Sequence, residues 1–337
     1  MAVLSGPATR DVRRAVQAVG IARAAFVAAA VVIVRQADAR AQPPSATARA
    51  ADVATLRKTI ATLEKESRGQ LGVGIELLET GEQVVVGTQH HPMQSVYKLP
   101  IAMAVLDLVD HRKLKLDQLV DVPVSMFVTP GQRSPIRDKY PNGTRASVRE
   151  LLRLNTAESD GTACDVLLGL IGGPAKATAY LRRIGVREMV VATTERVIGR
   201  DQRFQYRSWS TPAGSLTLLK VMQTGRVLSD SSRALLTRFL VETTTYPGRL
   251  RGQLPAGTVV AHKTGSSGTI KGLTAATNDI GILTLPDGRH LAVAVFLTDS
   301  RADDATRDRV IARVARAAWE TWVAPTVRPT ASPTKPR

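Results

Sequence analysis

The chain has 337 residues, 44% of them hydrophobic, a formal net charge of +17 and a single cysteine. This length suits one large domain or two small ones with a buried core. The basic residues are mostly arginines scattered along helical stretches, whereas nucleic-acid-binding proteins gather them on one face among aromatic residues. We therefore expect no nucleic-acid partner. The lone Cys164 rules out an internal disulfide and is interpreted as a buried structural thiol.

The first 41 residues have the pattern of an export signal. A basic stretch ends at Arg23, and the apolar run AAFVAAAVVIV (24–34) that follows is short for a membrane span. Small residues at Ala39 and Ala41 then form an A-x-A-like cleavage site. We expect residues 1–41 to be removed, which places the mature protein outside the cytoplasm with no stable membrane insertion. An uncleaved membrane anchor is the alternative.

The first half of the mature chain predicts a helix, a hairpin and a second helix. A linker at 42–50 leads into a helix at 52–69, and the alternating segment 71–87 is typical of a β-hairpin. Residues 95–113 predict a helix with an apolar face. The Pro- and Gly-rich stretch 121–145 is expected to be irregular.

The second half moves from helices to strands. Helices dominate from residue 147 to about 242. Three strand-like segments follow, the last two joined by a PDG turn: 258–267, 278–288 and 289–299. Residues 302–323 predict a terminal helix, and the Pro/Thr-rich tail 324–337 is expected to be disordered.

Strands therefore lie near both ends of the mature chain, with helices between them. The ends must meet to complete one sheet. This predicts an α/β fold of three layers (α/β/α), with a five-stranded antiparallel sheet and an inserted all-helical domain. The expected α/β domain is discontinuous, at 42–93 and 246–323, and the helical domain spans 94–245.

Residues 94–100, QSVYKLP, place a serine three residues before a lysine at the start of an apolar helix. A serine hydroxyl needs a neighbouring base to become a nucleophile. Residues three apart share a helix face, so Lys98 can reach Ser95. A lysine that is desolvated near other cations loses its proton near neutral pH, which would suit this role. Free N–H groups at the helix start can also stabilise an oxyanion.

Two further motifs strengthen this interpretation. Ser159-Asp160-Gly161 lies in the helical region, and Lys263-Thr264-Gly265 lies on a predicted strand. S-x-x-K, S-D-N and K-T-G together are the signature of class A β-lactamases and penicillin-binding proteins. Here the motifs occur in that order and in the expected structural settings.

The sequence resembles the class A serine β-lactamases over about residues 50–323. The segment 194–214 looks like the family's glutamate loop, with Glu195 at its start and Pro212 at its end. The stretches QYRSW, RSPIRDKYPNG and KTGSSGTIKGLTAATNDIGILTLPDGR are similar to the extended-spectrum subgroup typified by PER and VEB enzymes. The resemblance implies β-lactam antibiotics as the small-molecule partner and a periplasmic location.

The resemblance also implies a role for each matching residue. Ser95 would be the acylated nucleophile and Lys98 its base, with Glu195, acting through water, as the disputed alternative base. Ser159 would pass a proton to the β-lactam nitrogen, helped by Lys263. Glu195 would activate the water that hydrolyses the acyl-enzyme.

Substrate binding is implied for a further set of residues. Backbone N–H groups of Ser95 and Ser266 would form the oxyanion hole. Lys263 and Thr264 would hold the substrate carboxylate, and Arg249 matches a carboxylate-binding arginine of some members. The whole set of expected substrate-binding residues is Thr264, Gly265, Ser266, Arg249, Gly161 and Arg133.

Several positions depart from the family pattern. Gly161 replaces the asparagine of S-D-N, and Gly199 replaces an asparagine that in many members helps to hold the deacylating water. Arg133 stands where PER-like enzymes have an aromatic residue. Thr193 and Ser208 replace the Arg–Asp pair that holds the loop in many members, so we expect a mobile or differently folded loop.

Other side chains are given structural interpretations. Asp160 is expected to hold the domain interface through backbone hydrogen bonds, and Tyr206 and Trp209 to pack within the loop. His262 should point to the opposite face of its strand from Lys263. His90 and His91 have no third ligand at metal-like spacing, so neither a metal nor another cofactor is expected.

The leading hypothesis is thus an exported β-lactamase that acts as a monomer. A penicillin-binding DD-peptidase and a β-lactam sensor that stays acylated are the alternatives. Glu195, at the expected separation from Pro212, favours the β-lactamase.

Overall fold

The computed structural model describes residues 46–225 and 227–323. The expected export signal at 1–41 and the expected tail at 324–337 lie outside these residues. Within the described ranges, no helix has both the length and the apolar character needed to cross a bilayer.

The main sheet joins the two ends of the described chain. Its strands are antiparallel and run in the order β2 (Glu82–Val86), β1 (Gln70–Leu77), β11 (His290–Ser300), β10 (Leu273–Thr284) and β8 (Val260–Ser266). The two-residue strand β9 (Thr269–Ile270) adds a short pairing to β10. The expected α/β fold with an antiparallel sheet built from both chain ends is confirmed.

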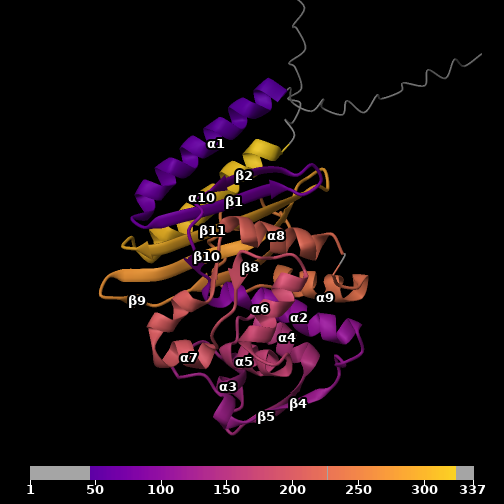
Figure 1. Cartoon of the computed structure of the whole chain (residues 1–337). Helices are drawn as coiled ribbons and strands as arrows, with labels where there is room; N and C mark the ends of the chain where they lie inside the picture. The colour runs from indigo at the N-terminus through magenta and orange to yellow at the C-terminus, as the bar shows by residue number, and fades with distance from the viewer. Residues whose placement is uncertain (1–45, 226, 324–337) are drawn as a thin grey trace, which may run out of the picture. The chain divides into compact units, whose positions relative to one another are not determined.

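Alternating side chains of β11 separate two hydrophobic cores, as the period of a strand requires. Leu291, Val293, Val295 and Leu297 face α1 (Ala46–Ser67) and α10 (Asp304–Trp322), which lie side by side over one face of the sheet (Figure 1). Ala292, Ala294 and Phe296 face the other core, which includes α8 (Pro212–Gln223) and the remaining helices.

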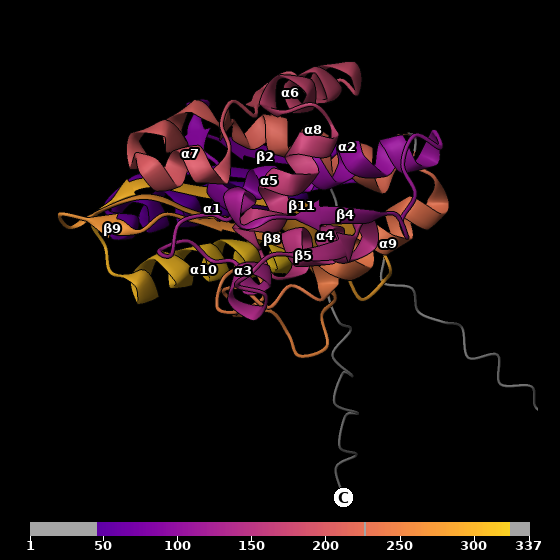
Figure 2. The same ribbon diagram turned by 90° about the horizontal axis from the view of Figure 1, so that it is seen from below.

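The helical part of the chain packs below the sheet in the view of Figure 1, and Figure 2 shows it from below. Side-chain oxygens cap the N-termini of several helices, with Ser147, Asp160, Thr194 and Thr211 each accepting from a backbone N–H three residues on. The helices of this part are α2 (Lys98–Asp110), α3 (Pro135–Lys139), α4 (Val148–Ala157), α5 (Gly161–Leu170), α6 (Pro174–Arg183), α7 (Glu195–Arg200) and α9 (Asp230–Val241).

Short elements complete the architecture. Three 3₁₀ turns are η1 (Gln94–Tyr97), η2 (Val124–Met126) and η3 (Gln202–Arg207). A small sheet pairs β3 (His91–Pro92), β7 (Trp209–Ser210) and β6 (Met189–Val190), and a second pairs β4 (Leu119–Val122) with β5 (Thr144–Ser147).

The sequence-based assignment was wrong at three places. Residues 46–50, expected to belong to a linker, form the first turn of α1. The stretch 121–145 is not wholly irregular, because it includes α3 and the β4–β5 pairing. These strands have four residues each and partners more than twenty residues away, so no local pattern indicates them. The helix expected at 95–113 is shorter: Ser95 lies in η1, and α2 begins at Lys98. The domain boundaries at 93/94 and 245/246 stay predictions.

Candidate active site

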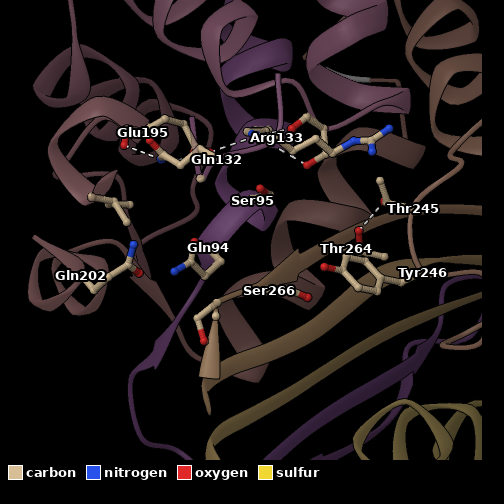
Figure 3. Close-up of a pocket in the computed structure, with 16 residues that line it drawn as sticks. Gln94, Ser95, Gln132, Arg133, Glu195, Gln202, Thr245, Tyr246, Thr264 and Ser266 are labelled. Atoms are coloured by element: carbon tan, nitrogen blue, oxygen red, sulfur yellow. Dashed lines mark hydrogen bonds and ion pairs between the residues drawn. The ribbon is translucent and has the colours of Figure 1, made fainter. Parts of the chain in front are cut away.

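A cavity of about 310 Å³ brings together residues from distant parts of the chain. Ser95 lies at its centre in Figure 3, with Glu195 and Gln132 on one side and Thr264, Thr245 and Tyr246 on the other. Its full lining is Gln94, Ser95, Lys98, Gly131, Gln132, Arg133, Ser159, Glu195, Ile198, Gln202, Thr245, Tyr246, Thr264, Ser266, Ser267 and Gly268.

The turn that carries Ser95 is held tightly against the edge strand β8. A Cβ atom added at Gly265 would lie 2.4 Å from the backbone oxygen of Met93, so only glycine permits this approach. The side-chain amide of Asn278 donates to the backbone oxygens of Pro92 at 2.8 Å and Met93 at 3.1 Å. Ser95 is thereby placed between α2 and the sheet at the floor of the cavity.

Lys98 is completely buried and lies between the other catalytic candidates. Its Nζ donates to the backbone oxygen of Ser159 at 2.7 Å, and it lies 3.0 Å from Oε1 of Glu195. Burial lowers the pKa of Lys98, but the adjacent Glu195 carboxylate outweighs it, so the pKa lies above its ordinary value. This direction favours a protonated Lys98 in the free protein, and the role of Lys98 as a base stays a prediction.

Lys263 is the lysine whose pKa falls. Burial, reinforced by the positive charge of Lys98, lowers the pKa of Lys263 to about 7. Its Nζ donates to the Ser159 hydroxyl at 3.0 Å and to the backbone oxygen of Thr264 at 3.1 Å. Ser159 adopts a positive φ of 58°, and its hydroxyl lies 3.5 Å from Lys98 Nζ. Both lysines thus approach one hydroxyl.

Two aspartates hold the surrounding backbone. Asp160 accepts from Ile136 N at 2.7 Å and Ala163 N at 2.8 Å, which confirms its expected role in backbone hydrogen bonding. Asp165 accepts from the N–H groups of Glu195 at 2.8 Å and Arg196 at 2.9 Å. Burial and the nearby Glu195 charge raise the pKa of Asp165 to about 6.

Only some of the expected substrate-binding residues line the cavity. Thr264, Ser266 and Arg133 line the cavity. Thr264 Oγ1 lies 2.6 Å from Thr245 Oγ1. The exposed Arg133 donates from Nε to the backbone oxygen of Glu158 at 2.6 Å.

Three others lie behind the lining. Gly265 contacts the Ser95 turn, and the N–H of Gly161 donates to the backbone oxygen of Arg133 at 2.9 Å. Arg249 is buried beneath Tyr246 and donates to Ser266 Oγ at 2.6 Å, while its Nε pairs with Asp308 at 2.7 Å. Arg249 therefore borders the site through Ser266.

Sequence reasoning missed much of the lining. Gln132, Thr245 and Tyr246 lie in loops and Gln202 begins η3, and the place of each at the cavity depends on tertiary packing. Gln94 adjoins the serine motif, but its contact with Gln205, at 2.6 Å between the two side-chain amides, joins segments 111 residues apart. Adjacency to Ser95 was the only signal available.

The histidines, the loop aromatics and the cysteine have structural surroundings. His262 is buried, and its Nδ1 lies 2.9 Å from Asp279 Oδ2, so it supports β8. His90 stacks on Trp209, and the Tyr206 hydroxyl donates to Asp299 at 2.5 Å. Cys164 is buried, as expected. Among residues 46–225 and 227–323, no three His, Cys, Asp or Glu side chains are grouped to hold a metal.

Together, the fold and the cavity define a serine hydrolase of the class A β-lactamase type. The model of the β-lactamase enzyme family matches residues 55–322, so the chain belongs to this family. It is 42% identical to the extended-spectrum β-lactamase PER-1 of Pseudomonas aeruginosa over 268 residues, covering 79% of this chain and 86% of the relative.

Two further comparisons agree. The chain is 34% identical to β-lactamase VEB-1 of Pseudomonas aeruginosa, covering 76% of this chain and 86% of the relative. A crystal structure of a β-lactamase from Chitinophaga pinensis matches with a TM-score of 0.77 and 46% identity, covering 79% of this chain and 98% of that one. The protein is thus a class A β-lactamase that resembles the PER/VEB-like subgroup.

Proposed function

We propose that this enzyme is exported and hydrolyses the β-lactam amide through an acyl-enzyme on Ser95. The observation that carries the proposal is the convergence of Ser95, Lys98, Ser159 and Glu195 on one cavity, with Lys98 Nζ 3.0 Å from the Glu195 carboxylate. A serine nucleophile needs a base, a proton donor for the leaving nitrogen and a means of deacylation. These side chains supply all three.

In the acylation step, Ser95 Oγ attacks the β-lactam carbonyl carbon. Backbone N–H groups of Ser95 and Ser266 stabilise the oxyanion. When the carbon–nitrogen bond breaks, the Ser159 hydroxyl gives its proton to the nitrogen. Lys263, which donates to that hydroxyl at 3.0 Å, and Lys98 favour this transfer and resupply the proton.

The proton of Ser95 goes to Glu195 through a water molecule. The raised pKa of Lys98 keeps this lysine protonated beside the carboxylate in the free enzyme. A protonated lysine cannot accept a proton, whereas the Glu195 carboxylate can. The charge distribution therefore supports Glu195 rather than Lys98 as the acylation base.

The substrate carboxylate is held at the β8 side of the cavity. Thr264 and Ser266 present hydroxyl groups there. The buried cation of Lys263, the residue before Thr264, attracts the anion from behind the lining. Arg249 orients Ser266 from behind. The Gly161 N–H donates to the backbone oxygen of Arg133 at 2.9 Å and so ties the segment that carries Arg133 to the start of α5. Arg133 extends the positive charge along the rim.

Before deacylation, Glu195 passes the proton that it took from Ser95 to Lys98, 3.0 Å away, which restores the charge used to resupply Ser159 and makes Glu195 a carboxylate again. In the deacylation step, Glu195 removes a proton from the water that attacks the acyl carbonyl, and this proton passes to Ser95 Oγ when the ester bond breaks. Replacing Glu195 by glutamine removes the base but keeps the shape of the side chain. We expect Glu195→Gln to accumulate the acyl-enzyme, with turnover reduced at least ~100-fold. Quenched-flow mass spectrometry would measure the adduct, and Ser95→Ala, which offers no nucleophile, is the control that should carry none.

Turnover by Glu195→Gln at the wild-type rate would contradict this role. A stable adduct on the wild-type protein would favour a DD-peptidase or a sensor. Export rests on the sequence of residues 1–41, and the periplasmic location rests on the resemblance to the PER/VEB-like subgroup. They are tested by N-terminal sequencing of the protein from a periplasmic fraction, which should begin after Ala41. Light scattering tests the expected monomer.

A further inference from the structure

The position four residues after Glu195 is a glycine, and its surroundings are already filled. A Cβ atom at Gly199 would lie 2.1 Å from Oε1 and 2.8 Å from Cδ of Gln132. It would also lie 2.8 Å from the hydroxyl oxygen of Thr129. The side chain of Gln132, which comes from the loop before α3, thus occupies the volume that a side chain at position 199 would take.

The amide of Gln132 has a defined orientation, because its two ends meet groups of opposite kind. Its Oε1 accepts from the Thr129 backbone N–H at 3.2 Å and from the Thr129 hydroxyl at 3.0 Å. Its Nε2 donates to the backbone oxygen of Glu195 at 2.7 Å and approaches Glu195 Oε2 to 3.3 Å. Thr129 N–H can only donate and the Glu195 backbone oxygen can only accept, so a reversed amide would lose both contacts.

This amide also lies at the reacting groups. Gln132, Glu195 and Ser95 line the same cavity, and Figure 3 shows Gln132 directly beside Glu195. The Glu195 carboxylate is therefore held between two donors, with Lys98 Nζ at Oε1 and Gln132 Nε2 at Oε2. The backbone N–H of Glu195 is held separately by Asp165.

We propose that Gln132 is a positioning residue for deacylation, and that its amide replaces, from another loop, the amide that Gly199 lacks. This inference rests on the proposed function, because it assigns Gln132 to the step in which Glu195 activates water. Gln132 fixes the direction of the carboxylate, and its amide forms the wall of the cavity beside the attacking water. A carboxylate displaced by about 1 Å would lose about 100-fold in rate.

The sharpest variant is Gln132→Glu. It keeps the length of the side chain and the oxygen that Thr129 contacts, but replaces the donor to Glu195 by a second carboxylate. We expect deacylation to slow about 100-fold, with acyl-enzyme accumulating while the acylation rate changes less than about threefold. Like charge disfavours ionisation of Glu195, so the acid limb of the deacylation rate should move to higher pH. A purely structural role would not move this limb.

A second set of variants tests whether the Gln132 amide takes the place of a side chain at position 199. In Gln132→Ala, deacylation should slow similarly. In Gly199→Asn alone, the new side chain collides with Gln132, so turnover should also fall. Combining Gln132→Ala with Gly199→Asn gives the new amide the vacated space, and we expect deacylation at least tenfold faster than in Gln132→Ala. Gln253→Ala, at an exposed glutamine away from the cavity, is the control and should match the wild type.

Each outcome decides the proposal. Wild-type deacylation in Gln132→Glu, equal losses of acylation and deacylation, or a double variant no faster than Gln132→Ala would overturn it. Melting curves identify any variant that fails to fold, and Gln132→Glu and Gln132→Ala provide independent readings. If the wild-type enzyme itself forms no adduct on Ser95, the proposed function fails. If the wild type forms and clears the adduct but the variants do so equally well, only the role of Gln132 fails.

Discussion

At the scale of single residues, the site contains two buried lysines with opposite pKa shifts. Lys98 is paired with a carboxylate, whereas Lys263 is buried next to Lys98 and has a pKa of about 7. Both reach the hydroxyl of Ser159, at 3.5 Å and 3.0 Å respectively. In the free enzyme the pKa of Lys98 is thus raised beside a carboxylate, whereas Lys263 titrates near neutral pH.

This difference predicts an alkaline limit on acylation. Below pH 7 Lys263 is protonated and attracts the substrate carboxylate, and above pH 7 it loses this charge in the free enzyme. We expect kcat/KM to fall as pH rises through about 7, while kcat holds to higher pH because the bound anion raises the pKa of Lys263. In Lys263→Arg the cation does not titrate, so kcat/KM should no longer fall as pH rises through about 7, even if the rate is lower. If the fall in kcat/KM persists unchanged in Lys263→Arg, a group other than Lys263 titrates.

The proposed catalytic residues could be predicted to the extent that they lie in local motifs. Ser95 and Lys98 are three residues apart, and Lys263 to Gly265 are consecutive, so their spacing is visible in the sequence. The partners that fix the charge of these residues are not visible in the sequence, because the Lys98–Glu195 pair and the Gln132–Glu195 contact join distant segments. The raised pKa of Lys98, which depends on the Glu195 carboxylate, is likewise not visible in the sequence.

At the scale of elements, the glutamate loop begins as a capped helix held by Asp165. Thr194 caps α7, and the Asp165 carboxylate in α5 accepts both N–H groups of the first two residues of α7. The missing Arg–Asp pair is thus accompanied by a different attachment: Ser208 Oγ accepts from Ala192 N at 3.1 Å. The sequence indicates that the Arg–Asp pair is missing. It does not indicate that Asp165 holds the start of α7, because nothing in the sequence distinguishes Asp165 from other residues of a buried helix.

Asp165→Asn tests this attachment. Asparagine has a single side-chain oxygen, so it cannot accept from both N–H groups as the two carboxylate oxygens do. Hydrogen exchange of the backbone N–H groups of Glu195 and Arg196 should therefore be faster, and turnover should fall. The wild-type carboxyl, with its pKa raised to about 6, contributes stability that is present below its unfolded pKa and lost as pH rises through 6. The variant should therefore gain in Tm relative to the wild type between about pH 4 and pH 7. A difference in Tm that stays constant across this range would contradict the assignment.

At the scale of the whole molecule, the two ends of the described chain close one sheet and one core. β1 pairs with β11 over eight residues, and α1 packs on α10. Alternating strands near both ends made this arrangement predictable, whereas the β4–β5 pair was not. Trp322 in α10 helps to hold the two ends together, because it is fully buried and its indole N–H donates to Glu82 in β2 at 3.1 Å.

Trp322→Ala should therefore destabilise the whole fold. Loss of a buried tryptophan costs about 3–5 kcal/mol in the free energy of unfolding, which urea denaturation followed by circular dichroism would measure. Truncation after Val323, which keeps this tryptophan and removes the expected tail, is the matched control and should leave the urea midpoint unchanged. Equal effects of the two changes would show that the closure does not depend on Trp322.

The central claim, that Ser95 is acylated and then released by Glu195, is tested most directly by the intact mass of the expected mature protein. Residues 42–337 would be mixed with a small excess of a cephalosporin and sampled over time. The account predicts an adduct that maps to Ser95, appears early and disappears as the drug is hydrolysed. The absence of any adduct with every β-lactam class, or an adduct that never clears, would contradict it.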